Sequence, residues 1–113
     1  MSAGLGNINE LAVGNPYVSV TTTVMPAVAS DKWRLFTFTV AGLTVETVTL
    51  QGTLDGSVWS NLRPIDASTG AVAAAVTLGN GSYRINDLGY LQLKIIKSAG
   101  AETATIWTSG RGF

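Results

Sequence analysis

Thr47-Val-Thr-Leu-Gln-Gly-Thr-Leu-Asp-Gly-Ser-Val-Trp-Ser-Asn-Leu62 is the stretch of sequence that decides the fold. Its first half alternates with period two, so that polar residues share one side of the predicted strand and three apolar residues share the other: Val48, Leu50 and Leu54. Asp55-Gly56 then favours a tight hairpin turn, because glycine adopts positive φ angles at little steric cost. Residues 58–62 form the predicted partner strand. Gly52, on the apolar side, predicts close packing or a bulge.

The same alternation continues toward the N-terminus. Residues 17–24 are rich in β-branched side chains, and three valines fall on one side: Val18, Val20 and Val24. Residues 32–41 predict a central strand whose inner side is strongly apolar: Phe36, Phe38 and Val40. Two further strands are therefore expected before the hairpin.

Toward the C-terminus the strands are short and separated by turn residues. Strands are expected over 72–78, which is rich in alanine, over 82–86 after Asn80-Gly81, over 88–97 and over 103–109. In 88–97 three apolar residues point inward: Leu91, Leu93 and Ile95. The tail 110–113 has too much glycine to continue as a strand. About eight short strands without a convincing helix predict an all-β protein, a single antiparallel β-sandwich of the jelly-roll or immunoglobulin-like kind.

The first residues follow a different pattern. Residues 1–16 contain three glycines, three asparagines and a proline, and their apolar residues show no strand period. We therefore expect a flexible N-terminal arm over 1–16 and a β-sandwich domain over 17–113. Leu5, Ile8 and Leu11 are spaced by three, which fits a turn or two of helix, although a strand or loop laid on a neighbour would accept the same residues.

Charge is scarce in this sequence. Only 12% of the residues are charged, against about 25% in typical soluble proteins, and seven basic residues balance seven acidic ones. Without a basic patch, nucleic acid is not an expected partner. No apolar stretch is long enough to span a bilayer, and the first nine residues do not resemble a signal peptide. Because so few charged residues are available for the surface, we expect partner proteins to cover much of it.

The chemistry of catalysis is also largely missing. The chain has neither His nor Cys, so it lacks the usual general base, the thiolate nucleophile and the nitrogen and sulfur ligands of transition metals. Asp55, Asp66 and Asp87 stand at predicted turns, which explains them without a catalytic role. Gly79-Asn80-Gly81 is a hairpin tip and not a phosphate loop. We expect no enzyme activity, no cofactor and no metal site.

Aromatic residues provide the remaining candidates for a site. Trp59 follows the hairpin turn, where packing in the core or on the hairpin is favoured. Trp33 and Trp107 stand on the more threonine-rich sides of their strands, where core packing and an interface contact are equally plausible. Phe113, after Gly-Arg-Gly, has no strand to hold it and is expected either to be disordered or to dock on a neighbour.

Four segments together resemble small structural proteins of tailed bacteriophages: 36–42, 48–59, 90–94 and 103–106. In those proteins a phrase similar to LQGTLDGSVWSNL occurs on a β-sandwich, and the resemblance covers about residues 35–108. The size and the arm look like those of a head decoration, or cement, protein. The resemblance implies a virion protein, made in the host cytoplasm, that binds the outer capsid and clamps neighbouring subunits of the major capsid protein. It implies no catalytic residues.

The resulting hypothesis is a capsid decoration protein that assembles permanently with its partners, either alone or as a homodimer or homotrimer. Its expected assembly residues are Leu5, Ile8, Leu11, Trp33, Trp107 and Phe113. The alternative is a carbohydrate-binding or tail-fibre β-sandwich that uses one of the three tryptophans as a stacking surface.

Overall fold

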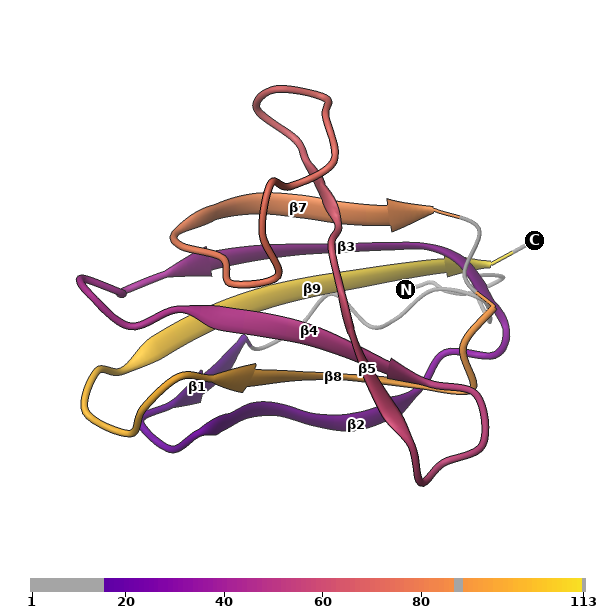
Figure 1. The fold of residues 1–113 in the computed structure, drawn as a ribbon, viewed down its shortest axis with the longest axis horizontal. Coiled ribbons are helices and arrows are strands. Elements are labelled where there is room, and N and C mark those ends of the chain that lie inside the picture. Colours follow the sequence, from indigo (N-terminus) through magenta and orange to yellow (C-terminus); the bar gives the residue numbers. More distant parts are fainter. Residues whose placement is uncertain (1–15, 87–88, 113) are drawn as a thin grey trace, which may run out of the picture.

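The computed structural model of the protein describes residues 16–86 and 89–112. Regular structure in these residues consists of nine strands in two antiparallel sheets that face each other (Figure 1). The strands are β1 (Tyr17–Ser19), β2 (Thr23–Ala29), β3 (Trp33–Ala41), β4 (Val48–Thr53), β5 (Trp59–Leu62), β6 (Ile65–Asp66), β7 (Gly81–Asn86), β8 (Gln92–Lys97) and β9 (Ala104–Gly112). The predicted antiparallel β-sandwich is confirmed.

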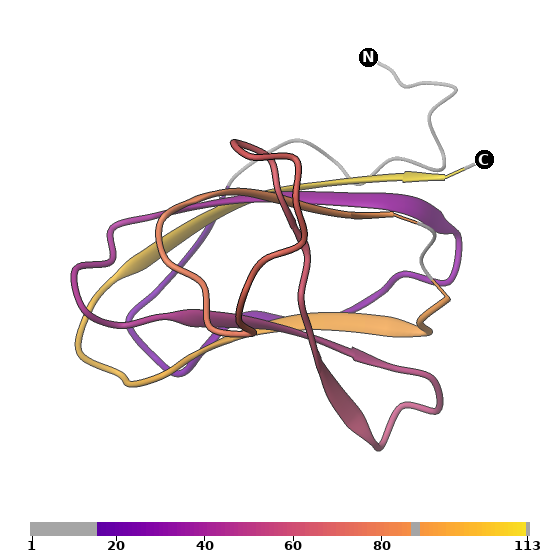
Figure 2. The same cartoon turned by 45° about the horizontal axis from the view of Figure 1, so that its top comes forward.

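The two sheets contain five and four strands. The five-stranded sheet has the order β1-β9-β3-β7-β6, and the four-stranded sheet has the order β2-β8-β4-β5. Figure 2 shows the two layers nearly edge-on, with the β4–β5 hairpin projecting from one end of the molecule. The projecting hairpin is the feature that positions the candidate site.

The core lies between β3 and β9 on one side and β4 and β8 on the other. Period-two alternation directs one set of side chains from each of these strands into it. Phe36, Phe38 and Val40 of β3 are buried as predicted, and so are Val48 and Leu50 of β4. Aromatic rings continue this core: Trp33 stacks on Phe36 at 5.6 Å between centroids, and Phe38 lies 5.4 Å from Tyr83.

The single strand predicted over 17–24 is wrong. The chain leaves the five-stranded sheet after Ser19 and enters the four-stranded sheet at Thr23. The Ser19 hydroxyl accepts a hydrogen bond from the Thr21 N–H at 3.0 Å, so a local bond replaces the sheet ladder at this corner. As a result Val18 and Val20 are exposed, and of the three valines predicted inward only Val24 is buried.

The tail predicted to be non-strand is wrong over 110–112. These residues belong to β9 and pair with the start of β3, where Phe36 is the partner of Gly110. A side chain at Gly110 would place its Cβ only 2.6 Å from the indole ring of Trp33. Glycine is therefore required here, because the buried Trp33 ring lies directly on the backbone of β9.

Three other sequence-based expectations are also corrected. Residues 72–78 form bends and not a strand, with isolated bridges at Val72 and Leu78. Leu78 nevertheless reaches the core and exchanges both backbone hydrogen bonds with Val48. Leu54 and Leu91 are exposed, although the alternation predicted both of them inward, because each lies just beyond the end of its strand. Both border the hollow described next.

Candidate interaction site at the tip of the hairpin

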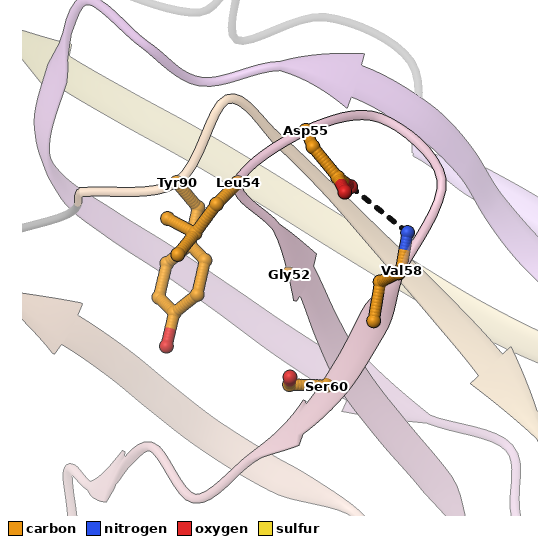
Figure 3. Close-up of a pocket in the computed structure, with 6 residues that line it drawn as sticks. All are labelled: Gly52, Leu54, Asp55, Val58, Ser60 and Tyr90. Carbon is orange, nitrogen blue, oxygen red and sulfur yellow. Dashed lines mark hydrogen bonds between the residues drawn. The ribbon is translucent and has the colours of Figure 1, made fainter.

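A hollow of about 410 Å³ opens at the end of the β4–β5 hairpin. Figure 3 shows Tyr90 and Leu54 on one side, Val58 and Ser60 on the other, and Gly52 between them. The hollow, called the tip groove below, is lined by Gly52, Leu54, Asp55, Val58, Ser60 and Tyr90. It exists because the hairpin extends beyond the body of the sandwich, which leaves part of its inner side uncovered.

The loop that carries the tip groove is held by a short side-chain network. Asp55 Oδ1 accepts hydrogen bonds from the Ser57 and Val58 N–H groups, both at 2.9 Å, and from the Thr53 hydroxyl at 3.1 Å. The Thr53 hydroxyl oxygen in turn accepts a bond from the Gly56 N–H at 3.0 Å. These donors, the Val58 N–H first, lower the pKa of Asp55 to about 2.

The predicted hairpin is confirmed, but its turn is longer than a two-residue turn. Thr53 pairs with Trp59, so the loop contains residues 54–58, with Gly56 at a φ of 87°. Asp55 therefore caps the loop through its side chain, and glycine supplies the positive φ. Asp55-Gly56 thus correctly predicted the position of the turn and the glycine with positive φ, but the loop has five residues and not two.

One wall of the tip groove, Tyr90, comes from the loop before β8. A Cβ atom on Gly52 would lie 2.8 Å from the Tyr90 ring, so the ring packs directly on the β4 backbone, which confirms the close packing predicted at Gly52. The Ser30 hydroxyl donates to the Tyr90 carbonyl at 2.8 Å, and the Leu91 N–H donates to the Thr53 carbonyl at 2.8 Å. Tyr90 is thus held by the β4 backbone under its ring, by the Ser30 hydroxyl at its carbonyl, and by the backbone hydrogen bond of Leu91, the next residue.

Large apolar side chains surround this opening. Leu54 is 72% exposed and Val58 is 68% exposed. A second hollow of about 230 Å³ shares Leu54 and Tyr90 with the tip groove and adds Leu91 and Asp31. The hairpin tip is therefore an apolar surface with two carboxylates at its border.

The three tryptophans have different environments. Trp33 is buried in the core, whereas Trp107 lies on the outer side of β9 and is 46% exposed. Trp59 is half-buried on the outer side of the four-stranded sheet, where the Lys94 ammonium lies 4.2 Å from its ring centroid. Leu5, Ile8, Leu11 and Phe113 lie outside the described residues. The assembly role of all six expected residues stays a prediction.

Sequence analysis missed a buried ion pair at the opposite end of β8. The Lys97 ammonium donates to Glu46 Oε1 at 2.6 Å, and both side chains are almost fully buried. Glu46 Oε2 accepts from the Ala101 and Glu102 N–H groups, and Glu102 Oε1 accepts from the Thr44 and Glu46 N–H groups. The two glutamates thus cap each other's loops, and the Lys97 hydrogen bond is the main cause of the lowered pKa of Glu46. The arrangement is structural, because every group in it already has a partner.

Across residues 16–86 and 89–112, no group of three acidic, His or Cys residues lies close enough together to hold a metal ion. The same residues contain no helix that is long and apolar enough to cross a membrane.

No family model matches the sequence, and no curated protein matches it either. Comparison with solved structures does find the same fold. The SPBc2 prophage-derived protein YomS has a TM-score of 0.67 at 8% identity, with 89% of each chain covered. The PBSX exported protein XepA has a TM-score of 0.64 at 10% identity, and the match spans 89% of this chain but only 36% of XepA. A family 32 carbohydrate-binding module from Clostridium perfringens reaches only 0.44 at 13% identity, over 82% of this chain and 71% of that module. The chain therefore shares the fold of YomS and of one part of XepA.

Proposed function

We propose that the protein is a virion structural component that binds the outer surface of a phage capsid and stabilises contacts between major capsid protein subunits. The observation that carries this proposal is the exposed apolar surface. Eight large apolar side chains among the described residues are exposed: Val18, Val20, Val45, Leu54, Val58, Val72, Leu91 and Trp107. Three of them, Leu54, Val58 and Leu91, gather around the two adjoining hollows at the hairpin tip, and a gathered apolar patch is typical of surfaces that are covered in an assembly.

Two further features support the proposal. The fold is shared with YomS, which is a prophage-derived protein. The chain carries only seven basic and seven acidic residues, so its contacts would be broad and weakly dependent on charge. The scarcity of charge fits a protein that stays on its partner after assembly.

The test compares particles of the phage that encodes this gene, prepared with and without the protein. We expect the purified protein to co-sediment with particles that lack it and to raise the temperature at which they release DNA. Unchanged thermal stability together with a failure to co-sediment would contradict the proposal. A chain starting at Tyr17 tests the arm, because it should fold normally and bind particles less tightly.

Oligomeric state is a separate part of the proposal. A homodimer or homotrimer would allow one assembly to reach several capsid subunits at once. Light scattering of the purified protein over a range of concentrations measures this directly, and a monomer at all concentrations would contradict the homo-oligomer.

A second candidate function, carbohydrate binding, rests on the outer side of the four-stranded sheet. There Trp59 lies under Lys94, and the Gln51 side-chain amide donates to Asn61 Oδ1 at 2.7 Å on the neighbouring strand. An aromatic ring beside amide side chains is a common way to bind sugars. A glycan array, with Trp59→Ala as the control variant, tests this function; no bound glycan would remove it.

A further inference from the structure

The tip groove combines three properties at one place. It is a hollow of about 410 Å³, its rim carries exposed Leu54 and Val58, and Asp55 borders it. Exposed aliphatic residues at a hairpin tip lose the stabilisation of burial, which is of the order of 25 cal/mol per Å² of apolar surface. The protein gains nothing for its own fold by placing them there, which points to a contact with another molecule.

The loop is already fixed in the geometry that it would need in a complex. The N–H groups of residues 56–58 donate to the side chains of Thr53 and Asp55, and the Tyr90 ring packs on the Gly52 backbone. A preorganised surface loses little conformational freedom when a partner binds. The tip groove therefore resembles a formed binding site more than an unstructured loop.

The lining residues define the chemistry of the occupant. Leu54, Val58 and the Tyr90 ring offer apolar contact, which fits an aliphatic or aromatic side chain. Asp55, whose low pKa keeps its carboxylate ionised at neutral pH, lies in the same lining and contributes a negative charge. The second hollow adds Asp31, and neither hollow has a lysine or arginine in its lining. A basic group next to the apolar one would complement this charge.

We infer that the tip groove is the docking site for a partner protein that presents an apolar side chain next to a lysine or arginine. If the proposed function is correct, this partner is the capsid subunit. The inference depends on the proposed function for the identity of the partner and not for the docking chemistry. A sugar fits less well. Most of the lining surface is apolar, and Asp55, Ser60 and the Tyr90 hydroxyl are too few to pair with the many hydroxyl groups of a sugar ring.

The first experiment uses capped dipeptides as probes and amide NMR of the full chain as the readout. N-acetyl-leucyl-arginine amide should shift the amide signals of the tip groove, with saturation on the order of millimolar, as expected for one side chain and one charge. The leucyl-glutamate analogue should bind up to about fivefold more weakly, because an exposed charge pair contributes modestly. The glycyl-arginine analogue should cause no saturable shift.

Two variants separate the charge from the apolar wall. Asp55→Asn keeps an Oδ1 acceptor for the loop and removes the charge, so it should abolish the preference for arginine over glutamate without abolishing binding. Val58→Ser should abolish binding, whereas the matched control Val45→Ser, at a valine that is 81% exposed in the loop between β3 and β4, should leave it unchanged. Melting curves of all three variants confirm that they fold.

Clear outcomes would overturn the inference. Dipeptides that shift no signal of the tip groove would do so, and so would monosaccharides that saturate it while the dipeptides do not. On particles, Val58→Asp should lower co-sedimentation at least about tenfold relative to Val45→Asp, as expected for loss of a central apolar contact. If wild type binds particles and both variants bind equally, the inference fails while the proposed function stands. If wild type does not bind, the proposed function fails, and the dipeptide experiment alone decides the docking chemistry.

Discussion

Replacement of Lys97 by methionine tests the interpretation of the buried network most directly. The Lys97 ammonium has four oxygens around it: Glu46 Oε1 at 2.6 Å and the carbonyls of Val20, Ala99 and Glu102 at 2.9, 2.7 and 2.5 Å. Methionine retains most of the apolar stem but supplies no donor and no charge. The variant therefore leaves Glu46 opposite no cation and removes the three N–H donors that Glu46 and the three carbonyls share.

The expected loss of stability follows from the burial of the Lys97 and Glu46 side chains. Removal of one partner from a buried ion pair costs about 3–5 kcal/mol, because the remaining charge is left without compensation. For 113 residues, an unfolding entropy of about 2.1 cal/mol/K per residue gives about 0.24 kcal/mol/K in total. The melting temperature of Lys97→Met should therefore fall by about 12 to 20 °C.

Thermal unfolding followed by circular dichroism measures this shift, and Lys94→Met is the matched control. Lys94 lies three residues earlier on the same strand, and its ammonium contacts only the half-buried Trp59 ring in the described contacts. Its loss should cost no more than about 1 kcal/mol. If Lys97→Met melts within about 4 °C of the wild type, or no lower than Lys94→Met, the network does not stabilise the fold and this reasoning is wrong.

Two other predictions concern the tip loop and the C-terminal strand. The pKa of Asp55 lies at about 2 in the folded protein, below its ordinary value of 3.8, so its ionisation favours the folded state above about pH 4, and this contribution is lost as the pH falls toward 2. Asp55→Asn should therefore lose stability less steeply than the wild type between pH 4 and pH 2 in urea titrations, and identical slopes would contradict the assigned pKa. Gly110→Ala should destabilise the protein by about 1–3 kcal/mol, because its Cβ would overlap the Trp33 ring, whereas Gly79→Ala meets no atom within 4 Å. Equal melting temperatures for the two alanine variants would refute the packing described for Trp33.

Features encoded by neighbouring residues were predictable from the sequence. Period-two alternation identified β3 and β4 and the side of each strand that faces the core, and Asp55-Gly56 identified the hairpin. These signals are local, because a strand's two faces follow from the backbone geometry alone. The sandwich follows from repeated local signals of this kind.

Features that depend on distant contacts were not predictable in the same way. Gly110 belongs to a strand because it pairs with Phe36, more than seventy positions earlier, and it must be glycine because the Trp33 ring packs on it. Tyr90 lines the tip groove because Gly52 leaves space for its ring. The buried Lys97 did have a signal in the sequence, since it shares the period-two side of Leu93 and Ile95. A charged residue in an inward position indicates a buried partner, but only the fold identifies that partner as Glu46.

The corner after Ser19 also determines how the molecule would respond to mechanical force. A pull on Pro16 that is directed along the axis of β1 loads the hydrogen bonds between β1 and β9 together in shear, because the two strands lie antiparallel through three residue pairs. Beyond the corner, the Lys97 ammonium bonds to the Val20 carbonyl and the Lys97 N–H bonds to the Thr22 carbonyl. Tension entering through β1 is therefore passed to the opposite sheet at the position of the buried ion pair. A tether attached at this end of the described chain would pull on both layers of the sandwich and would not peel away one strand.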